Sequence, residues 1–254
     1  MSESLRLGFL YPDSSGEDDL VTFASRLCPP ADAIIAHTVV PEDVNREDAL
    51  IETGAQHRLA AGAAELASQR VSAVIWTCTS ASFVFGLDGA RHQAAALAEQ
   101  LGVPASSTSL AFLNALSTIN AVRVAIASIY PQPLTVIFTR FLAAAGIDVV
   151  SSVSAGVESG KKTATMDYAY ADELVARLDL DDADAVLLPC TALHTADVLC
   201  ALERSMPCHV LTANQVTVWE VARLAGASGV QPSLGRLGST DLSAAGHPPY
   251  LSEP

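Results

Sequence analysis

The chain has 254 residues, of which half are hydrophobic and 17% are charged, so it holds ample material for a buried core. Its formal net charge is −14, with 28 acidic against 14 basic residues, which argues against nucleic acid and anionic membranes as partners. A small anionic ligand is not excluded, because backbone N–H groups and hydroxyls can hold one.

The start of the chain does not have the pattern of a targeting segment. "MSESLRLGFLYPDSS" contains an acid and only a short apolar run, unlike a signal peptide. No stretch of about 18 apolar residues occurs, so no membrane span is predicted. We therefore expect a cytoplasmic protein whose five cysteines stay reduced. No Cys-x-x-Cys pair or His-rich spacing indicates a metal site.

Short apolar runs alternate along the chain with Ala- and Leu-rich segments of helical length. Because the apolar residues in the short runs are consecutive, they predict parallel strands covered on both faces. The predicted strands are 5–11, 32–40, 71–76, 122–130, 147–154, 184–189 and 208–213. The predicted helices are 46–69, 88–102, 131–146 and 167–179, with Gly102 and Gly146 as helix ends. This alternation indicates an α/β fold.

The two halves of the chain share landmarks in the same order. "RLGFLYP" ends at Pro12 as "RVAIASIYP" ends at Pro131, Cys78 and Cys190 follow matching strands, and segment 103–116 resembles segment 206–221. An internal duplication explains this pattern. We predict two α/β lobes related by a pseudo-twofold axis, each a parallel four-stranded sheet with flanking helices. The expected divisions are 1–117 for the first lobe, joined by a C-terminal helix and wrap at 215–240, 118–214 for the second lobe, and 241–254 for a tail.

Two of the predicted strands lead to a cysteine followed by a threonine. "AVIWTCTSAS" (73–82) contains Cys78, and "DAVLLPCTALHT" (184–195) contains Cys190. Ligands of parallel sheets bind beyond the carboxyl ends of the strands, so we expect the two thiols to face each other across a cleft between the lobes. The alternative is that both are packing residues, because free cysteines are commonly buried. Cys28, Cys200 and Cys208 are given this second interpretation.

Two facing thiols would give such a cleft a specific chemistry. A thiolate is a strong nucleophile and a usable base, and its pKa falls at a helix N-terminus, where we expect both cysteines to lie. The hydroxyls of Thr79, Ser80 and Thr191, with nearby backbone amides, would form pockets for a carboxylate or a developing enolate. One thiol on each side of a ligand suits either a two-base proton exchange or addition to a double bond with the other thiol as acid.

The residues around both cysteines resemble the active-site loops of one superfamily. "CTSASF" (78–83) and "LLPCTALHT" (187–195) resemble the two loops of the Asp/Glu racemase superfamily, in its branch of arylmalonate decarboxylases and maleate cis-trans isomerases. "ASIYPQPL" (127–134) resembles the segment that carries an active-site tyrosine, here Tyr130. The similarity extends from "RLGFLYP" to "WEVARLAG". It implies a small carboxylic acid as substrate and no metal or organic cofactor.

The resemblance also implies roles for individual residues. Arylmalonate decarboxylases keep only the second cysteine, so the presence of Cys78 favours a cofactor-independent isomerase or racemase. Cys78 would add to the alkene of a maleate-like acid, and Cys190 would act as acid and base. The residues implied to bind the substrate are Pro12, Asp13, Ser15, Thr79, Ser80, Tyr130 and Thr191.

Several alternatives remain at this level. Maleate isomerases have asparagines that "PDSSGEDD" (12–19) and "SAGVESGKKTATM" (154–166) do not match, whereas "DSSG" (13–16) resembles a glutamate racemase loop and would favour an amino-acid substrate. Asp13 is otherwise a cap of a turn. A malonate decarboxylase with Cys190 as proton donor and a non-catalytic carboxylate-binding protein are the competing hypotheses.

Three further expectations concern the surroundings of the cleft. His194 either tunes the pKa of Cys190 or is a solvated or packing residue. Lys161 and Lys162 are expected in an exposed charged loop, with a mobile lid as the alternative. An Ala-rich surface helix would allow a homo-oligomer.

Overall fold

The computed structural model describes residues 4–13, 16–166 and 169–244. Its strands form two four-stranded sheets in the orders β2-β1-β3-β4 and β6-β5-β7-β8, and every paired strand is parallel. The predicted pair of parallel four-stranded sheets is therefore confirmed. The first sheet contains β1 (Arg6–Pro12), β2 (Asp32–Thr38), β3 (Ala73–Trp76) and β4 (Ala105–Ser107). The second contains β5 (Arg123–Ser128), β6 (Asp148–Ser154), β7 (Ala185–Leu188) and β8 (His209–Thr212).

The strands at the centre of each sheet explain the apolar runs in the sequence. β3 and β7 are buried over their whole length, as strands covered on both faces must be. β4 was not among the predicted strands, because its three residues, Ala-Ser-Ser, carry no apolar run. Its parallel pairing with β3 defines it as a strand, with Ser107 opposite Trp76.

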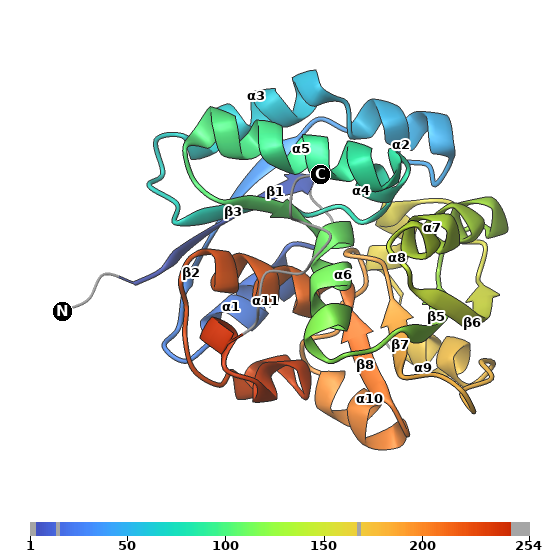
Figure 1. Ribbon diagram of the computed structural model, residues 1–254. Helices are drawn as coiled ribbons and strands as arrows, with labels where there is room; N and C mark the ends of the chain where they lie inside the picture. The colour runs from blue at the N-terminus through green and yellow to red at the C-terminus, as the bar shows by residue number, and fades with distance from the viewer. Residues whose placement is uncertain (1–3, 14–15, 167–168, 245–254) are drawn as a thin grey trace.

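Helices cover both sheets (Figure 1). In the first half they are α1 (Asp18–Ser25), α2 (Glu47–Thr53), α3 (Gln56–Leu66), α4 (Ser80–Phe83), α5 (Gly86–Leu101) and α6 (Thr108–Thr118). In the second half they are α7 (Gln132–Ala144), α8 (Gly160–Ala164), α9 (Ala169–Val175), α10 (Leu199–Ser205) and α11 (Ala213–Leu224), before 3₁₀ turns at Pro232–Leu234, Leu237–Ser239 and Leu242–Ala244. Among the helices described, none has the length and apolar character needed to cross a membrane.

Glycines end two helices where the sequence predicted. Gly102 follows α5 with φ 67°, and Gly146 lies just beyond α7 with φ 80°. Both values fall in the left-handed region, which glycine enters at little cost because it has no Cβ. The predicted helix ends at these positions are confirmed.

The helix predicted over 46–69 is wrong as one continuous helix. It is divided into α2 and α3 at Gly54 and Ala55, and Ala55 is extended with ψ 140°. Gly54 packs so closely on α4 that a Cβ there would lie 2.2 Å from the Ala81 carbonyl oxygen, and Gln93 donates a hydrogen bond to the Gly54 carbonyl (2.8 Å). This tertiary contact fixes the break, which periodicity alone does not reveal.

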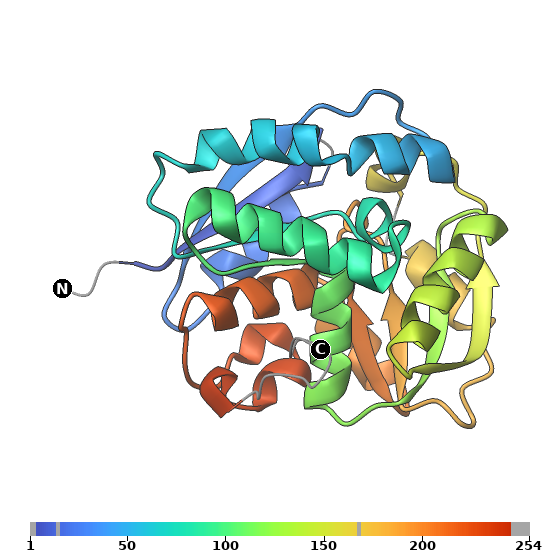
Figure 2. The ribbon, with the colours of Figure 1, turned by 45° about the horizontal axis from the view of Figure 1, so that its top comes forward.

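α6 and α11 lie side by side in the middle of the molecule in both views (Figures 1 and 2). Asn114 of α6 donates a hydrogen bond to Glu220 of α11 (2.7 Å), and Glu220 also pairs with Arg223 at 3.0 Å. All three side chains are largely buried. The C-terminal helix thus contacts the last helix of the predicted first lobe, and the exact lobe boundaries stay a prediction.

Aromatic side chains join the two halves beside the cleft. The Phe83 ring of α4 lies 5.9 Å from that of Tyr130 and 5.1 Å from that of Phe138 in α7. The loop that carries Cys78 is therefore anchored against the second half of the chain.

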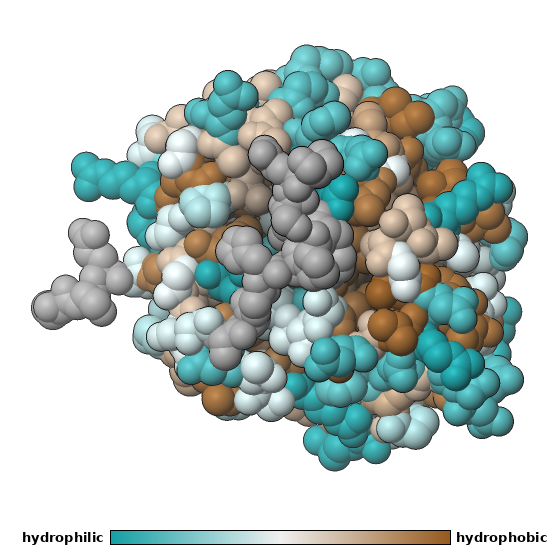
Figure 3. Space-filling model, viewed as in Figure 1, coloured by the Kyte–Doolittle hydropathy of each residue, from teal (hydrophilic) through white to brown (hydrophobic). Residues whose placement is uncertain are grey.

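Polar and apolar residues are interspersed on the face shown in Figure 3. The large hydrophobic residues that are exposed lie on separate elements and loops; they are Val21, Val39, Ile51, Val122, Val136 and Val230. The homo-oligomer stays a prediction.

Candidate active site

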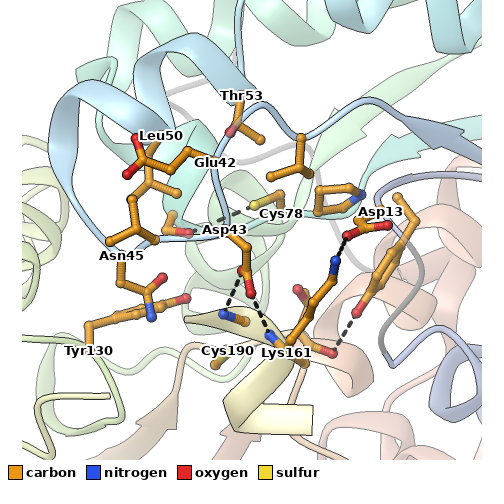
Figure 4. Close-up of a pocket in the computed structure, with 18 residues that line it drawn as sticks. Asp13, Glu42, Asp43, Asn45, Leu50, Thr53, Cys78, Tyr130, Lys161 and Cys190 are labelled. Carbon is orange, nitrogen blue, oxygen red and sulfur yellow. Dashed lines mark hydrogen bonds and ion pairs between the residues drawn. The ribbon is translucent and has the colours of Figure 1, made fainter. Parts of the chain in front are cut away.

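A cavity lies at the carboxyl ends of the strands, and both Cys78 and Cys190 line it (Figure 4). Its volume is about 70 Å³. The other described residues that line it are Tyr11, Pro12, Asp13, Val40, Glu42, Asp43, Val44, Asn45, Leu50, Thr53, Ser80, Tyr130, Gly160, Lys161, Thr191 and Ala192. Segments from both halves of the chain therefore form one site.

Cys78 follows β3, the buried strand at the centre of the first sheet. Its residue is 7% exposed, and its Sγ lies 3.8 Å from the Ser80 hydroxyl oxygen. Burial raises the pKa of the Cys78 thiol, although hydrogen bonds from the Ala81 amide and the Ser80 hydroxyl lower it. The expectation that a helix N-terminus would lower this pKa is wrong, because α4 has only four residues and desolvation outweighs its amides.

Cys190 follows β7 in the equivalent place of the second sheet. Burial raises the pKa of its thiol to about 11, and the negative charge of a Cys78 thiolate adds to this rise. The amides of Ala192 and Leu193 and the Tyr130 hydroxyl act in the opposite direction. Residues 191–198 form turns, a bend and irregular backbone, and α10 begins only at Leu199, so the helix expected next to Cys190 is wrong.

The two thiols influence each other's ionisation. Burial raises the pKa of both, and a charge on Cys78 raises that of Cys190 further. Because two neighbouring acids do not both ionise readily, one thiol keeps its proton when the other becomes a thiolate.

Two buried tyrosines flank Cys190. Tyr130 donates a hydrogen bond to the Pro189 carbonyl (2.7 Å), and Tyr11 donates one to the Thr191 carbonyl (3.4 Å). Burial raises the pKa of both phenols, so both remain protonated donors. The sequence reasoning missed Tyr11, although aligning "RLGFLYP" with "RVAIASIYP" pairs it with Tyr130.

The residues predicted to bind the substrate are placed as follows. Pro12, Asp13, Ser80, Tyr130 and Thr191 all line the cavity. Thr79 precedes α4 and is not among the lining residues found in the described part of the chain. Ser15 lies outside the described residues.

His194 lies away from the thiols on the outer side of its loop. Its Nε2 is 2.8 Å from the Asp18 carboxylate, and its side chain is 38% exposed. It does not line the cavity. Of its two predicted roles, the solvated residue fits this geometry.

Hydrogen bonds join residues 43–45 of the first half to residues 157–161 of the second half beside the cavity. The Asn45 amide donates to the Glu158 carbonyl (2.6 Å), and the Asn45 side chain donates to the Val157 carbonyl (2.8 Å). The Asp43 carboxylate accepts hydrogen bonds from the amides of Gly160 (2.9 Å) and Lys161 (3.3 Å). Asp43 and Asn45 were not predicted as site residues, because they occur in a loop without a motif.

Lys161 brings a positive charge to the cavity. Its Nζ lies 2.6 Å from the Asp13 carboxylate, and it is the one Lys, Arg or His among the described lining residues. Asp13 has φ 58°, and its amide donates to the Thr38 carbonyl at the end of β2 (3.1 Å), so its predicted role as a cap of a turn stays a prediction. The expectation of a plain exposed loop holds for Lys162, whereas Lys161 belongs to the site.

The three remaining cysteines differ in their exposure to solvent. Cys28 and Cys200 are exposed, so the packing role expected for them is wrong, and Cys208 is partly buried. Within residues 4–13, 16–166 and 169–244, no three His, Cys, Asp or Glu side chains gather as metal ligands would. That the protein needs no cofactor stays a prediction.

Two parallel sheets that each place a cysteine in one shared cavity define a protein of the Asp/Glu racemase superfamily. The chain belongs to the arylmalonate decarboxylase family, whose sequence model matches residues 48–238.

Three relatives illustrate the breadth of this similarity. Arylmalonate decarboxylase of Bordetella bronchiseptica is 30% identical over 203 residues, which cover 79% of this chain and 81% of the relative. A maleate isomerase of Geobacillus stearothermophilus is 25% identical over 181 residues, covering 69% and 72%. The solved structure of a Nocardia farcinica maleate cis-trans isomerase variant aligns with TM-score 0.85 and 22% identity over 93% of this chain and 99% of that one. These relatives are enzymes of two reaction types.

Proposed function

We propose that this protein is a cofactor-independent isomerase or racemase of a small carboxylic acid, with maleate as the model substrate. The observation that carries the proposal is that Cys78 and Cys190 line the same cavity. In the proposed reaction Cys78 is the nucleophile. Cys190 is the acid, because burial raises the pKa of its thiol to about 11 and it keeps its proton near neutral pH.

The proposed reaction begins when the Cys78 thiolate adds to one alkene carbon and forms a C–S bond. The displaced π electrons form a carbanion on the neighbouring carbon, stabilised as an enediolate by its carboxylate, and Cys190 protonates that carbon. The resulting C–C single bond rotates. The Cys190 thiolate then removes the proton again, the C–S bond breaks, and the trans diacid leaves with both thiols restored.

Polar groups of the cavity can hold a carboxylate, beside the acidic lining residues Asp13, Glu42 and Asp43. Lys161 can attract one carboxylate, and the hydroxyls of Ser80 and Thr191 can donate to it or to the other. The Nocardia farcinica relative was solved with a covalently bound succinylcysteine intermediate, which is the type of adduct that this reaction forms.

Replacing either thiol tests the proposal. We expect Cys78→Ala and Cys190→Ala each to reduce maleate isomerisation by at least about 10³-fold, because each step needs both groups. Cys200→Ala is the matched control, since that thiol is exposed and far from the cavity lining. A Cys78→Ala variant that keeps near-native activity would rule out the two-thiol mechanism.

Decarboxylation of a substituted malonate is the second candidate. The family model and the 30% identity to an arylmalonate decarboxylase favour it. In this reaction Cys190 alone would protonate the enediolate left by loss of CO₂. Measuring CO₂ release from aryl- and alkylmalonates, beside isomerisation of maleate and racemisation of amino acids, separates the candidates. If every substrate is inert and iodoacetamide labels the thiols slowly at neutral pH, the chain is a carboxylate-binding protein instead.

A further inference from the structure

A buried carboxylate outside the cavity holds the loop that follows Cys190. Asp19 of α1 is 4% exposed and does not line the cavity. Its oxygens accept hydrogen bonds from the Thr195 amide (3.0 Å) and hydroxyl (3.4 Å), the Ala196 amide (2.9 Å) and the Asn214 side chain (2.8 Å). Burying a charged carboxylate is costly unless donors surround it, and here four of them do so.

Asn214 of α11 fixes the same loop from a second direction. Its side-chain amide is fully buried and donates to the carbonyls of Thr191 (3.0 Å) and Leu193 (3.3 Å) as well as to Asp19. The three elements that meet here are far apart in sequence, so their contact depends on the complete fold.

The loop needs such support because it has little structure of its own. Residues 191–198 form turns, a bend and irregular backbone without the repeating hydrogen bonds of a helix or a strand. The Leu193 amide donates to the Cys190 carbonyl (3.3 Å), and the amides of Ala192 and Leu193 lower the pKa of the Cys190 thiol. Any shift of the loop therefore moves these amides relative to the thiol.

We propose that Asp19 and Asn214 are positioning residues that hold the loop 191–196, and with it the amides of Ala192 and Leu193, in place beside Cys190. The role of Cys190 in catalysis rests on the function proposed above, whereas the positioning itself concerns the thiol and its amides. Neither residue touches the ligand.

The test measures the ionisation of Cys190 directly. Replacing Cys28, Cys78, Cys200 and Cys208 by Ser leaves Cys190 as the one thiol, and its alkylation by iodoacetamide is followed against pH. Asp19→Asn is expected to slow alkylation at pH 9 by about tenfold, as a rise of about one pKa unit requires, because the loop amides are no longer held beside the thiol. Cys78, Tyr11 and Tyr130 face Cys190 in the native chain. Every variant of this test carries Ser at position 78 and keeps both tyrosines. Differences between variants therefore do not come from these three groups.

The sign of the change separates the proposal from a simple charge effect. Removing the negative charge of Asp19 would by itself favour the thiolate and speed alkylation. Asp88→Asn is the control, because Asp88 is exposed on α5 and contacts Arg91 rather than the loop, and it should change the rate by less than about twofold. Unchanged or faster alkylation in Asp19→Asn would overturn the proposal.

Two further measurements keep the result interpretable. If circular dichroism finds that Asp19→Asn does not fold, Asn214→Ala carries the test, with slower alkylation expected for the same reason. Because alkylation needs no substrate, failure of every candidate acid to react would refute the proposed function and leave this test intact.

Discussion

At the scale of single residues, the ionisation of Cys78 should control the pH dependence of activity. Burial raises the pKa of this thiol above its ordinary range, so only a small fraction is thiolate near pH 7. We expect kcat/KM for maleate to rise about tenfold per pH unit from pH 6 to 8 and to decline near pH 11, where Cys190 loses its proton.

The Ser80 hydroxyl provides the control for this profile. It lowers the pKa of Cys78, so Ser80→Ala should move the rising limb to higher pH while the slope stays the same. Initial rates measured between pH 6 and 11 check both expectations. A rate that does not change over this range would contradict the assignment of Cys78 as the thiolate.

Lys161 should determine the affinity for a second carboxylate. Its ammonium group is partly exposed and already shares its charge with Asp13, so we expect Lys161→Met to raise KM for a dicarboxylate by only about five- to tenfold, with little change in kcat. Lys162→Met is the matched control, since Lys162 does not line the cavity. Steady-state kinetics with a diacid and its monoamide would show whether the loss depends on the second charge.

At the scale of elements, the break between α2 and α3 should matter for both stability and binding. Gly54→Ala places a methyl group against the Ala81 carbonyl, and relieving this overlap should cost about 1–3 kcal/mol. Because α2 carries Leu50 and Thr53 of the cavity wall, KM should rise as well.

Gly102→Ala distinguishes these two effects. This residue has φ 67° and open space around it, so its substitution should cost about 1 kcal/mol through the backbone alone. Thermal unfolding and steady-state kinetics should show lower stability in both variants and altered KM in Gly54→Ala alone. Equal KM values would indicate that α2 does not shape the cavity.

At the scale of the whole molecule, the buried pair of Glu220 and Arg223 in α11, to which Asn114 of α6 also binds, should contribute strongly to stability. Glu220→Ala leaves Arg223, whose side chain is 8% exposed, without its carboxylate, and loss of one partner of a buried pair costs about 3–5 kcal/mol. Asp182→Ala removes the exposed partner of Arg123 and should cost less than about 0.5 kcal/mol. Urea unfolding checks both values, and a loss below about 1 kcal/mol in Glu220→Ala would contradict this assignment.

Much of the fold could be predicted because its signals are local. Consecutive apolar runs marked the buried strands, and glycines marked the ends of α5 and α7. β4 and the break at Gly54 could not be predicted in this way. Both depend on contacts with distant segments, namely the pairing of β4 with β3 and the packing of Gly54 on Ala81.

The candidate site also contains residues that local sequence signals predict and residues that depend on contacts between distant segments. Residues directly after strands, such as Cys78, Cys190 and Tyr130, could be placed from the sequence because parallel strands all point to one edge. Asp43, Asn45 and Lys161 come from loops whose path depends on contacts between the two halves, so no spacing pattern marks them. The thiol pKa values were misjudged because burial, which outweighs the backbone amides, is a property of the complete fold.

The hydrogen bonds of Tyr11 and Tyr130 have a stereochemical consequence. Although the tyrosines occupy equivalent places in the two repeats, both donate to carbonyls next to Cys190 and neither donates to those next to Cys78 within the described part of the chain. The pocket is therefore a chiral environment. Under the proposed mechanism, one side of a planar ligand would meet the proton donor Cys190 and the other would meet Cys78. A prochiral carbanion protonated by Cys190 alone would give a single enantiomer, whereas racemisation would require both thiols to transfer protons.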